Sequence, residues 1–218
     1  MADVPSESEK DLERRLRLGD KEALAAVFDA NRARLWRIVK FRMDPRLAGR
    51  VEPDDVLQEA YLASAQRIGH FGSDFMASPF MWLRVVVQQT LIDVHRRHIG
   101  AEKRDAGREV SLGASPFSQT TSESLAARLI GNFTSPSQAA ARNETFEIVQ
   151  KAVESMDPID REILALRHFE ELTNAEAAEA LGIQQKAASI RYVRAVKRLK
   201  SILKSVPGMS DDRPEAGA

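Results

Sequence analysis

The sequence predicts an all-α protein built from two small helical domains that are joined by a flexible linker. Apolar residues recur every three or four positions through residues 8–99 and again from 146 to 203, which is the period of an amphipathic helix. Serine, threonine, glycine and proline crowd the segment between these two stretches, as they do in linkers. No stretch of useful length alternates apolar and polar residues, so no strand is expected.

The composition is that of an ordinary soluble protein, and it excludes several kinds of site. The chain has 218 residues, of which 43% are hydrophobic and 29% charged, and it contains no cysteine. The lack of cysteine excludes a disulfide-stapled scaffold, a zinc ribbon and a cysteine nucleophile. The first residues lack a signal-peptide pattern, and no apolar run approaches the ~18 residues of a membrane helix. A cytoplasmic protein without membrane insertion is therefore expected.

The first helical domain is expected over residues 8–99. Pro53 suits the first turn of a helix, and the acidic pair Asp54 and Asp55 favours the positive N-terminal end of that helix. Glycine, serine and proline mark a loop over residues 69–79. A further helical stripe of apolar residues then follows and ends in the basic cluster at residues 95–98.

The segment from 100 to 143 is predicted to be the linker. Serine, threonine, glycine and proline supply 16 of its 44 residues, and such a composition is typical of flexible connections. A small interaction helix near residues 125–130 is the alternative, although six residues form only a marginal helix in isolation.

The second helical domain is expected over residues 144–204, with a disordered tail over 205–218. Asp157 precedes a proline, which indicates a helix cap followed by the first helical position. Thr173 and Glu176 have the spacing of a capping box, so a short helix begins there. Gly182 ends that helix, and a basic helix follows from about Gln185 to Leu203.

A short helix, a glycine turn and a basic helix together form the pattern of a helix-turn-helix, whose second helix enters the major groove of DNA. Glutamine and lysine at the start of that helix suit base edges, because glutamine pairs with adenine and lysine reaches guanine. The residues at that start are Gln184, Gln185, Lys186 and Ser189. The apolar row predicted to face the core comprises Ile190, Val193, Val196 and Leu199. A helical hairpin with a solvated basic face is the alternative.

The net charge is zero, with 32 basic and 32 acidic residues, but the charges are segregated. Residues 32–50 carry seven basic side chains and one acidic one, whereas residues 52–59 carry four acidic side chains and no basic one. Residues 184–206 carry seven basic side chains and no acidic one. Patches of both signs suit one acidic and one basic partner. The alternative is that each run is a solvated helix face.

Two separate blocks of the sequence resemble the sigma-70 family of bacterial RNA polymerase sigma factors, especially its extracytoplasmic-function (ECF) group. Residues 157–204 are similar to region 4, through the motifs LALR at 164–167, EAA at 176–178, LGI at 181–183 and RA at 194–195. Residues 20–99 are similar to region 2, through DDVLQEAYL at 54–62, FMWL at 80–83 and LIDVHRR at 91–97. Lys186 and Ala187 stand where many members of the family have glycine and threonine.

The resemblance implies a sigma factor, which directs RNA polymerase core enzyme to specific promoters and assists promoter melting. It implies no catalytic activity, no cofactor and no metal, with RNA polymerase core enzyme, promoter DNA and an anti-sigma factor as partners. The alternative is a stand-alone helix-turn-helix transcription regulator whose N-terminal part is a sensor or dimerisation domain. An enzyme is not favoured, because the sequence has no phosphate-cradling glycine loop, nucleophile elbow or metal-ligand cluster.

The resemblance also assigns expected roles to individual residues. The polymerase-docking face comprises Asp54, Asp55, Gln58 and Glu59, although the two aspartates also suit helix capping. The residues expected at the minus-ten element are Phe71, Phe75, Arg84, Gln88, Gln89, Arg96 and Arg97. The residues expected at the minus-thirty-five element are Gln184, Gln185, Lys186, Ser189, Arg191, Arg194 and Arg198. Aromatic rings stack exposed bases, and arginines contact phosphates.

Overall fold

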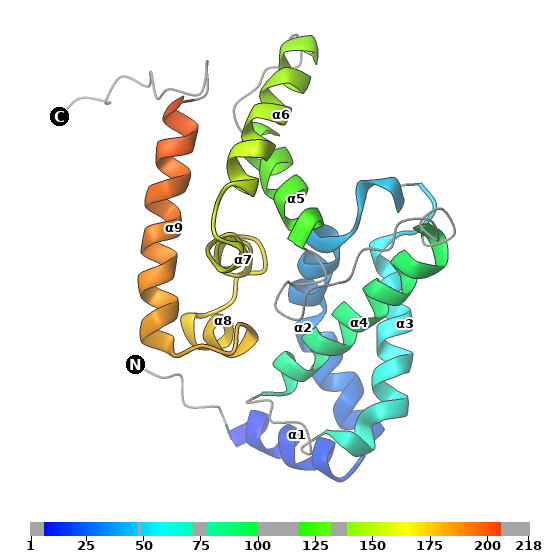
Figure 1. Ribbon diagram of the computed structural model, residues 1–218. Coiled ribbons are helices and arrows are strands. Elements are labelled where there is room, and N and C mark those ends of the chain that lie inside the picture. The colour runs from blue at the N-terminus through cyan, green and yellow to red at the C-terminus, as the bar shows by residue number, and fades with distance from the viewer. Residues whose placement is uncertain (1–6, 48, 72–77, 100–117, 132–138, 206–218) are drawn as a thin grey trace, which may run out of the picture. The chain divides into compact units, whose positions relative to one another are not determined.

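A computed structural model describes residues 7–47, 49–71, 78–99, 118–131 and 139–205 (Figure 1). Every regular element in these ranges is a helix, so the predicted all-α fold class is confirmed. The chain divides into two compact units, Met1–Glu109 and Val110–Ala218, and each is considered by itself below. The predicted disordered tail lies outside the described residues from residue 206 onward.

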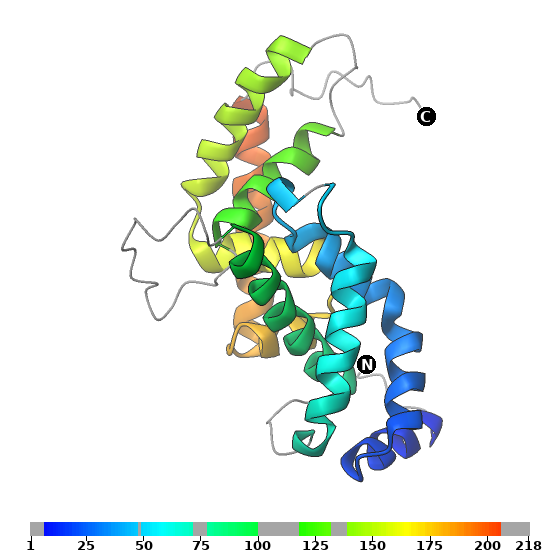
Figure 2. The same cartoon turned by 90° about the vertical axis from the view of Figure 1, so that its right-hand side faces the viewer.

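The first unit is a bundle of α1 (Glu7–Arg17), α2 (Lys21–Arg42), α3 (Pro53–Arg67) and α4 (Pro79–Ile99). Short 3-10 turns η1 (Pro45–Leu47) and η2 (Ile68–His70) follow α2 and α3. Helices α2, α3 and α4 pack against one another, and α1 packs against α2 (Figure 2). Leu35, Leu57 and Leu91 contribute one fully buried side chain from each of these three helices. Burial of such apolar side chains is what holds the three helices together.

Side-chain caps and a proline define the helix starts of this unit, where the sequence predicted Pro53 and the acidic pair at the start of α3. Asp20 caps α2, because its carboxylate accepts hydrogen bonds from the backbone N–H groups of Glu22 at 2.9 Å and Ala23 at 3.0 Å. Pro53 occupies the first helical position of α3. Asp55 reaches back to accept from the backbone N–H of Glu52 at 3.2 Å, which completes a capping box.

The second unit consists of α5 (Ser118–Gly131), α6 (Ala139–Glu154), α7 (Pro158–His168), α8 (Asn174–Ala180) and α9 (Gln185–Ser205). Helix α9 packs against α6, α7 and α8, and α5 packs against α6 and α7. The core between them is formed by Met156, Ile163, Leu164, Ala178, Ala188, Ala195 and Ile202. Three of these residues are alanines, and alanines allow helices to cross closely.

The prediction of a linker throughout residues 100–143 is wrong for residues 118–131 and 139–143, and the alternative of a small helix near residues 125–130 is nearer to the structure. Residues 118–131 form α5, and Leu125, Ala126 and Ile130 of this helix are buried. The Nη1 of the buried Arg161 donates a hydrogen bond to the Ser122 hydroxyl at 2.7 Å, which ties α5 to α7. Contacts with α6 and α7 therefore stabilise a helix whose serine- and threonine-rich composition suggests a loop. The first half of the predicted linker, residues 100–117, lies outside the described residues.

Candidate functional site

The start of α9 is presented to solvent by the turn that precedes it. Gly182 adopts a φ of 62°, a conformation that glycine reaches without steric cost, and it separates α8 from α9. Asn174 at the start of α8 donates a side-chain hydrogen bond to the carbonyl of Gln185 at 3.0 Å, which ties the two helices together. The residues predicted to read bases, Gln184, Gln185, Lys186 and Ser189, are all exposed. The geometry is therefore compatible with a recognition helix that offers its N-terminal half to a ligand.

The predicted core face of α9 is largely wrong. Ile190 is 60% exposed and Val193 is 51% exposed, and Val196 is also at the surface. Ala188, Ala195 and Ile202 face the core instead, together with the half-buried Leu199, which is the one member of the predicted row that packs there. The helix carries two apolar rows, and the row that contains alanines faces the core because α9 packs closely against α7 and α8. The solvent-facing row therefore combines Ile190 and Val193 with neighbouring lysines.

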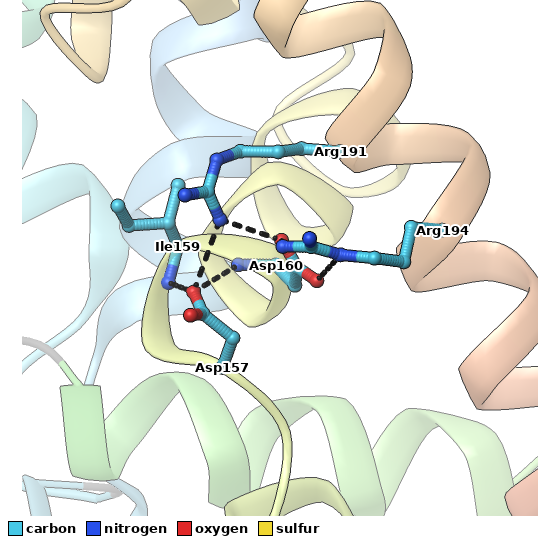
Figure 3. Close-up of polar contacts among 5 residues, drawn as sticks. All are labelled: Asp157, Ile159, Asp160, Arg191 and Arg194. Atoms are coloured by element: carbon cyan, nitrogen blue, oxygen red, sulfur yellow. Dashed lines mark hydrogen bonds and ion pairs between the residues drawn. The ribbon is translucent and has the colours of Figure 1, made fainter.

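Two of the arginines expected on DNA, Arg191 and Arg194, form ion pairs with carboxylates at the start of α7 (Figure 3). Arg194 makes a two-pronged contact with Asp160, from Nε to Oδ2 at 2.6 Å and from Nη2 to Oδ1 at 2.8 Å. Arg191 donates from Nη1 to Asp160 Oδ1 at 3.0 Å and to Asp157 Oδ1 at 3.3 Å. Asp157 is also the cap of α7, since it accepts from the backbone N–H of Ile159 at 2.9 Å.

Asp160 is almost completely buried, and its electrostatics are set by the two arginines. Burial raises the pKa of the Asp160 carboxyl, but the hydrogen bonds from Arg194 and Arg191 lower it by more, so the net pKa is below the usual range. The carboxylate is therefore ionised at neutral pH. Asp160 is not among the predicted site residues, and the one signal for it in the sequence is that Arg191 and Arg194 share one helix face. Arg198, the third predicted arginine, is exposed on α9.

The predicted polymerase-docking residues lie together on the exposed face of α3. Asp54 forms an ion pair with Arg32 of α2 at 2.6 Å, and Glu59 pairs with Arg97 of α4. Asp55 takes part in the capping box, so capping and exposure coexist at this residue. Gln58 is also exposed. The face thus alternates acidic groups with basic groups supplied by the neighbouring helices.

Leu62 lies on this same face and is 56% exposed. It follows Gln58 by four residues and Glu59 by three, the spacings at which side chains on a helix are neighbours. Leu62 is not among the predicted docking residues, although its helical spacing from Gln58 and Glu59 places it on their face. Single exposed leucines are common on protein surfaces, so it is the position of Leu62 beside Gln58 and Glu59 that makes it a candidate for this face.

The residues predicted for the minus-ten element divide into buried and exposed groups. Phe71 is only 6% exposed, with its ring 5.4 Å from that of Trp82, so the expectation that it offers a free face to a base is wrong for this structure. Arg84 is only 4% exposed, which contradicts the expectation of a side chain presented at the surface. Phe71, directly after η2, packs on Trp82 of α4, and Arg84 lies on the buried side of α4. Phe75 lies outside the described residues.

The C-terminal half of α4 carries the exposed members of this group. Gln89, Arg96 and Arg97 are exposed, and Gln88 is half-buried. Gln89 accepts a hydrogen bond from Arg67 of α3, and Arg96 lies 4.0 Å from Asp93. This end of α4 therefore presents a polar surface with several basic groups.

Neither a metal site nor a membrane span emerges from the described ranges. No group of three or more histidine or acidic side chains in that part of the chain is placed to hold a metal ion. Of the helices described, none is both long and apolar enough to cross a bilayer.

Comparison with known proteins shows that the chain is similar to RNA polymerase sigma factors. The family model "Sigma-70, region 4" matches residues 146–199, which include α7, α8 and most of α9. The ECF RNA polymerase sigma factor BldN of Streptomyces coelicolor is 24% identical over 205 residues, which cover 93% of this chain and 68% of BldN. The RNA polymerase sigma factor NccH of Alcaligenes xylosoxydans xylosoxydans is 29% identical over 154 residues, which cover 70% of this chain and 73% of NccH.

A solved structure shares the fold. CnrH, determined in complex with the cytosolic domain of CnrY, matches with a TM-score of 0.50 over 91% of this chain and 98% of CnrH. The identity is 19%, so this likeness concerns the fold. It agrees with the all-α architecture described above.

Proposed function

We propose that this chain acts as a sigma factor of the sigma-70 family, like the ECF proteins to which it is similar, and that it directs the core enzyme to specific promoters and assists in melting them. The observation that carries the proposal is the set of exposed polar side chains at the start of α9, which follows a glycine turn within the segment that matches region 4. A helix presented in this way fits the major groove of duplex DNA.

Base recognition at the minus-thirty-five element is assigned to the solvent-facing row of α9. Gln184, Gln185 and Lys186 reach the hydrogen-bonding edges of bases, and Ser189 lies on the same exposed side. Ile190 and Val193 add apolar contacts, for which the C5-methyl group of thymine is the matching feature of the groove.

Contact with the polymerase is assigned to α3. The exposed carboxylates of Asp54 and Glu59 complement a basic surface, and Leu62 supplies an apolar contact between polar neighbours. The ion pairs with Arg32 and Arg97 are exposed, so they exchange readily for contacts with a partner.

Contact with the minus-ten element is assigned to the C-terminal half of α4, through Gln88, Gln89, Arg96 and Arg97. Arginines at such a surface neutralise phosphates, and glutamines hydrogen-bond to the edges of unpaired bases. Stabilisation of the separated strand by these contacts is the means by which the protein assists melting, without a chemical reaction of its own.

An anti-sigma factor that covers these faces is the proposed regulatory partner. CnrH, the structural relative, has been solved with the cytosolic domain of another protein, CnrY. The proposed place of action is the bacterial cytoplasm, where RNA polymerase and promoter DNA are found.

The first test is binding to RNA polymerase core enzyme by gel filtration. The wild-type chain is expected to co-elute with core enzyme, and the double reversal Asp54→Lys/Glu59→Lys is expected to abolish co-elution. This variant spares the capping residue Asp55. Asp29→Lys/Glu144→Lys is the matched control, since it makes the same change in charge at exposed sites on α2 and α6.

The outcomes separate the sigma factor from the stand-alone regulator. Co-elution of the double reversal at wild-type level would remove α3 from the interface. A folded wild-type chain that binds duplex DNA but not core enzyme would favour the regulator. If the wild-type chain binds core enzyme, sequencing of run-off transcripts made with the reconstituted holoenzyme would identify the promoters.

A further inference from the structure

We infer that Asp160 is a positioning residue that holds Arg191 and Arg194 against α7, so that these two arginines do not neutralise DNA phosphates. The inference rests on the proposed function of α9 and refines it. It divides the basic residues of this helix into a pair that orients the helix and an exposed group that contacts DNA.

The contacts with Asp160 satisfy both of its carboxylate oxygens. Oδ2 accepts from Arg194 Nε at 2.6 Å, while Oδ1 accepts from Arg194 Nη2 at 2.8 Å and from Arg191 Nη1 at 3.0 Å (Figure 3). A parallel pair of bonds from one guanidinium to one carboxylate is the strongest geometry that such a pair adopts. Arg194 is therefore held in a defined orientation, even though part of its side chain is at the surface.

Burial makes this arrangement difficult to undo. The side chain of Asp160 is only 7% exposed. A buried carboxylate that loses its cationic partner remains as an uncompensated charge in a medium of low dielectric constant. Transfer of Arg194 to a phosphate would leave Asp160 in that state, with only the single bond from Arg191. A phosphate contact from an exposed arginine or lysine carries no such cost.

The position of the arginines on α9 explains what the contact does. Arg191 and Arg194 are three residues apart and point toward α7, next to the buried Ala195. Lys197 and Arg198 are exposed on the same helix. Anchoring Arg191 and Arg194 to α7 fixes the rotation of α9 about its own axis. That rotation determines which side chains meet the groove, so Asp160 acts on DNA recognition through the two arginines.

The salt dependence of DNA binding distinguishes a phosphate contact from a positioning role. Each phosphate contact contributes about 0.9 to the magnitude of the slope of log K against log salt. One such contact therefore weakens DNA binding by roughly 3.5-fold when the salt concentration rises from about 50 to 200 mM. The probe is a fluorescein-labelled duplex of mixed sequence, and binding of the full chain is followed by fluorescence anisotropy. The variants are Arg194→Gln and, as matched controls on the same helix, Lys197→Gln and Arg198→Gln.

We expect Arg194→Gln to retain the wild-type slope, even if its affinity falls equally at every salt concentration. At least one of the two control variants is expected to lower the slope by about 0.9. A fall in the slope of Arg194→Gln that matches this control would overturn the inference. The inference would also fail if neither control variant changed the slope, because Lys197 and Arg198 would then make no phosphate contact.

A double-mutant cycle in urea unfolding tests the contact without DNA. Asp160→Asn and Arg194→Gln are each expected to destabilise the chain, and the pair is expected to show a coupling of at least about tenfold in the unfolding equilibrium constant. Additive effects of the two substitutions would overturn the inference. Absence of duplex binding by a folded wild-type chain would instead count against the proposed function, and the cycle would still decide whether Asp160 holds α9.

Discussion

Replacement of Leu125 by alanine tests whether α5 is an integral part of the second unit. Leu125 lies in the segment whose composition predicts a linker, yet its side chain is 2% exposed. The helix that carries it packs against α6 and α7. Leu125→Ala should therefore destabilise the second unit, whereas the same substitution in a solvated linker would have little effect.

The expected magnitude follows from burial. Truncation of a fully buried leucine to alanine costs about 2–5 kcal/mol, because transfer free energy is lost and a cavity remains. For a small unit, the free energy of unfolding falls by about 1–3 kcal/mol for each molar increment of urea. A loss of about 3 kcal/mol therefore moves the unfolding midpoint roughly 1–3 M lower.

The two tryptophans of the chain make the assay selective. Trp36 and Trp82 both belong to the first unit, so tryptophan fluorescence reports that unit, whereas circular dichroism reports the helices of both. Leu125→Ala should bring an early phase into the circular dichroism curve and leave the fluorescence transition in place. Leu35→Ala, at a fully buried position of the first unit, should shift the fluorescence transition instead.

Leu62→Ala is the matched control, because Leu62 is exposed on α3. Its effect should stay within about 0.5 kcal/mol. If Leu125→Ala behaved like Leu62→Ala in both signals, α5 would not be packed in the second unit, and the account of its stabilisation by α6 and α7 would be refuted.

Three further predictions concern the turn, the first cap and base recognition. Gly182→Ala should lower the free energy of unfolding of the second unit by about 1 kcal/mol in urea, because a side chain strains a residue at positive φ. Gly182→Asn should lower it by less, since asparagine tolerates positive φ, and equal losses for the two variants would contradict this explanation. Hydrogen bonds from Arg15 and from the N–H of Ala23 lower the pKa of Asp20 to about 2, below its unfolded value. The stability that ionised Asp20 contributes is therefore complete above about pH 4 and is lost as the pH falls toward 2. Thermal unfolding of Asp20→Asn should depend less on acid pH than that of the wild type, and parallel curves would argue against this role. Ile190→Ala should reduce discrimination between thymine and uracil in selected minus-thirty-five duplexes by several-fold, since uracil lacks the methyl group, and unchanged discrimination would show that Ile190 does not contact that group.

Local signals predicted the fold class and the helix starts well. The caps at Asp157 and Thr173, the capping box with Glu176 and the turn at Gly182 all occur where their residue types indicate. Each of these features depends on hydrogen bonds or backbone angles within a few residues, so the sequence specifies them directly. The exposure of Gln184 to Lys186 follows from the same local features, because the turn places them at the start of α9.

Features that depend on distant packing were missed or assigned wrongly. The composition of residues 118–131 suggests a loop, and only contacts with α6 and α7 make this segment a buried helix. Phe71 and Arg84 have residue types that suit DNA, but the bundle buries both side chains. The local sequence pattern does not predict these features, because whether a side chain is buried depends on which distant residues pack over it.

By itself, the sequence determined the all-α class, the positions of the caps, the turn before α9 and the resemblance to sigma factors. Only the tertiary structure decided which apolar row of α9 is buried, because close packing against α7 and α8 favours the row with alanines. It also decided the partner of Arg191 and Arg194, because Asp160 lies 31 and 34 residues earlier in the chain. Spacing along a chain predicts neighbours within a helix, whereas an ion pair between helices exists only after packing has brought its charges together.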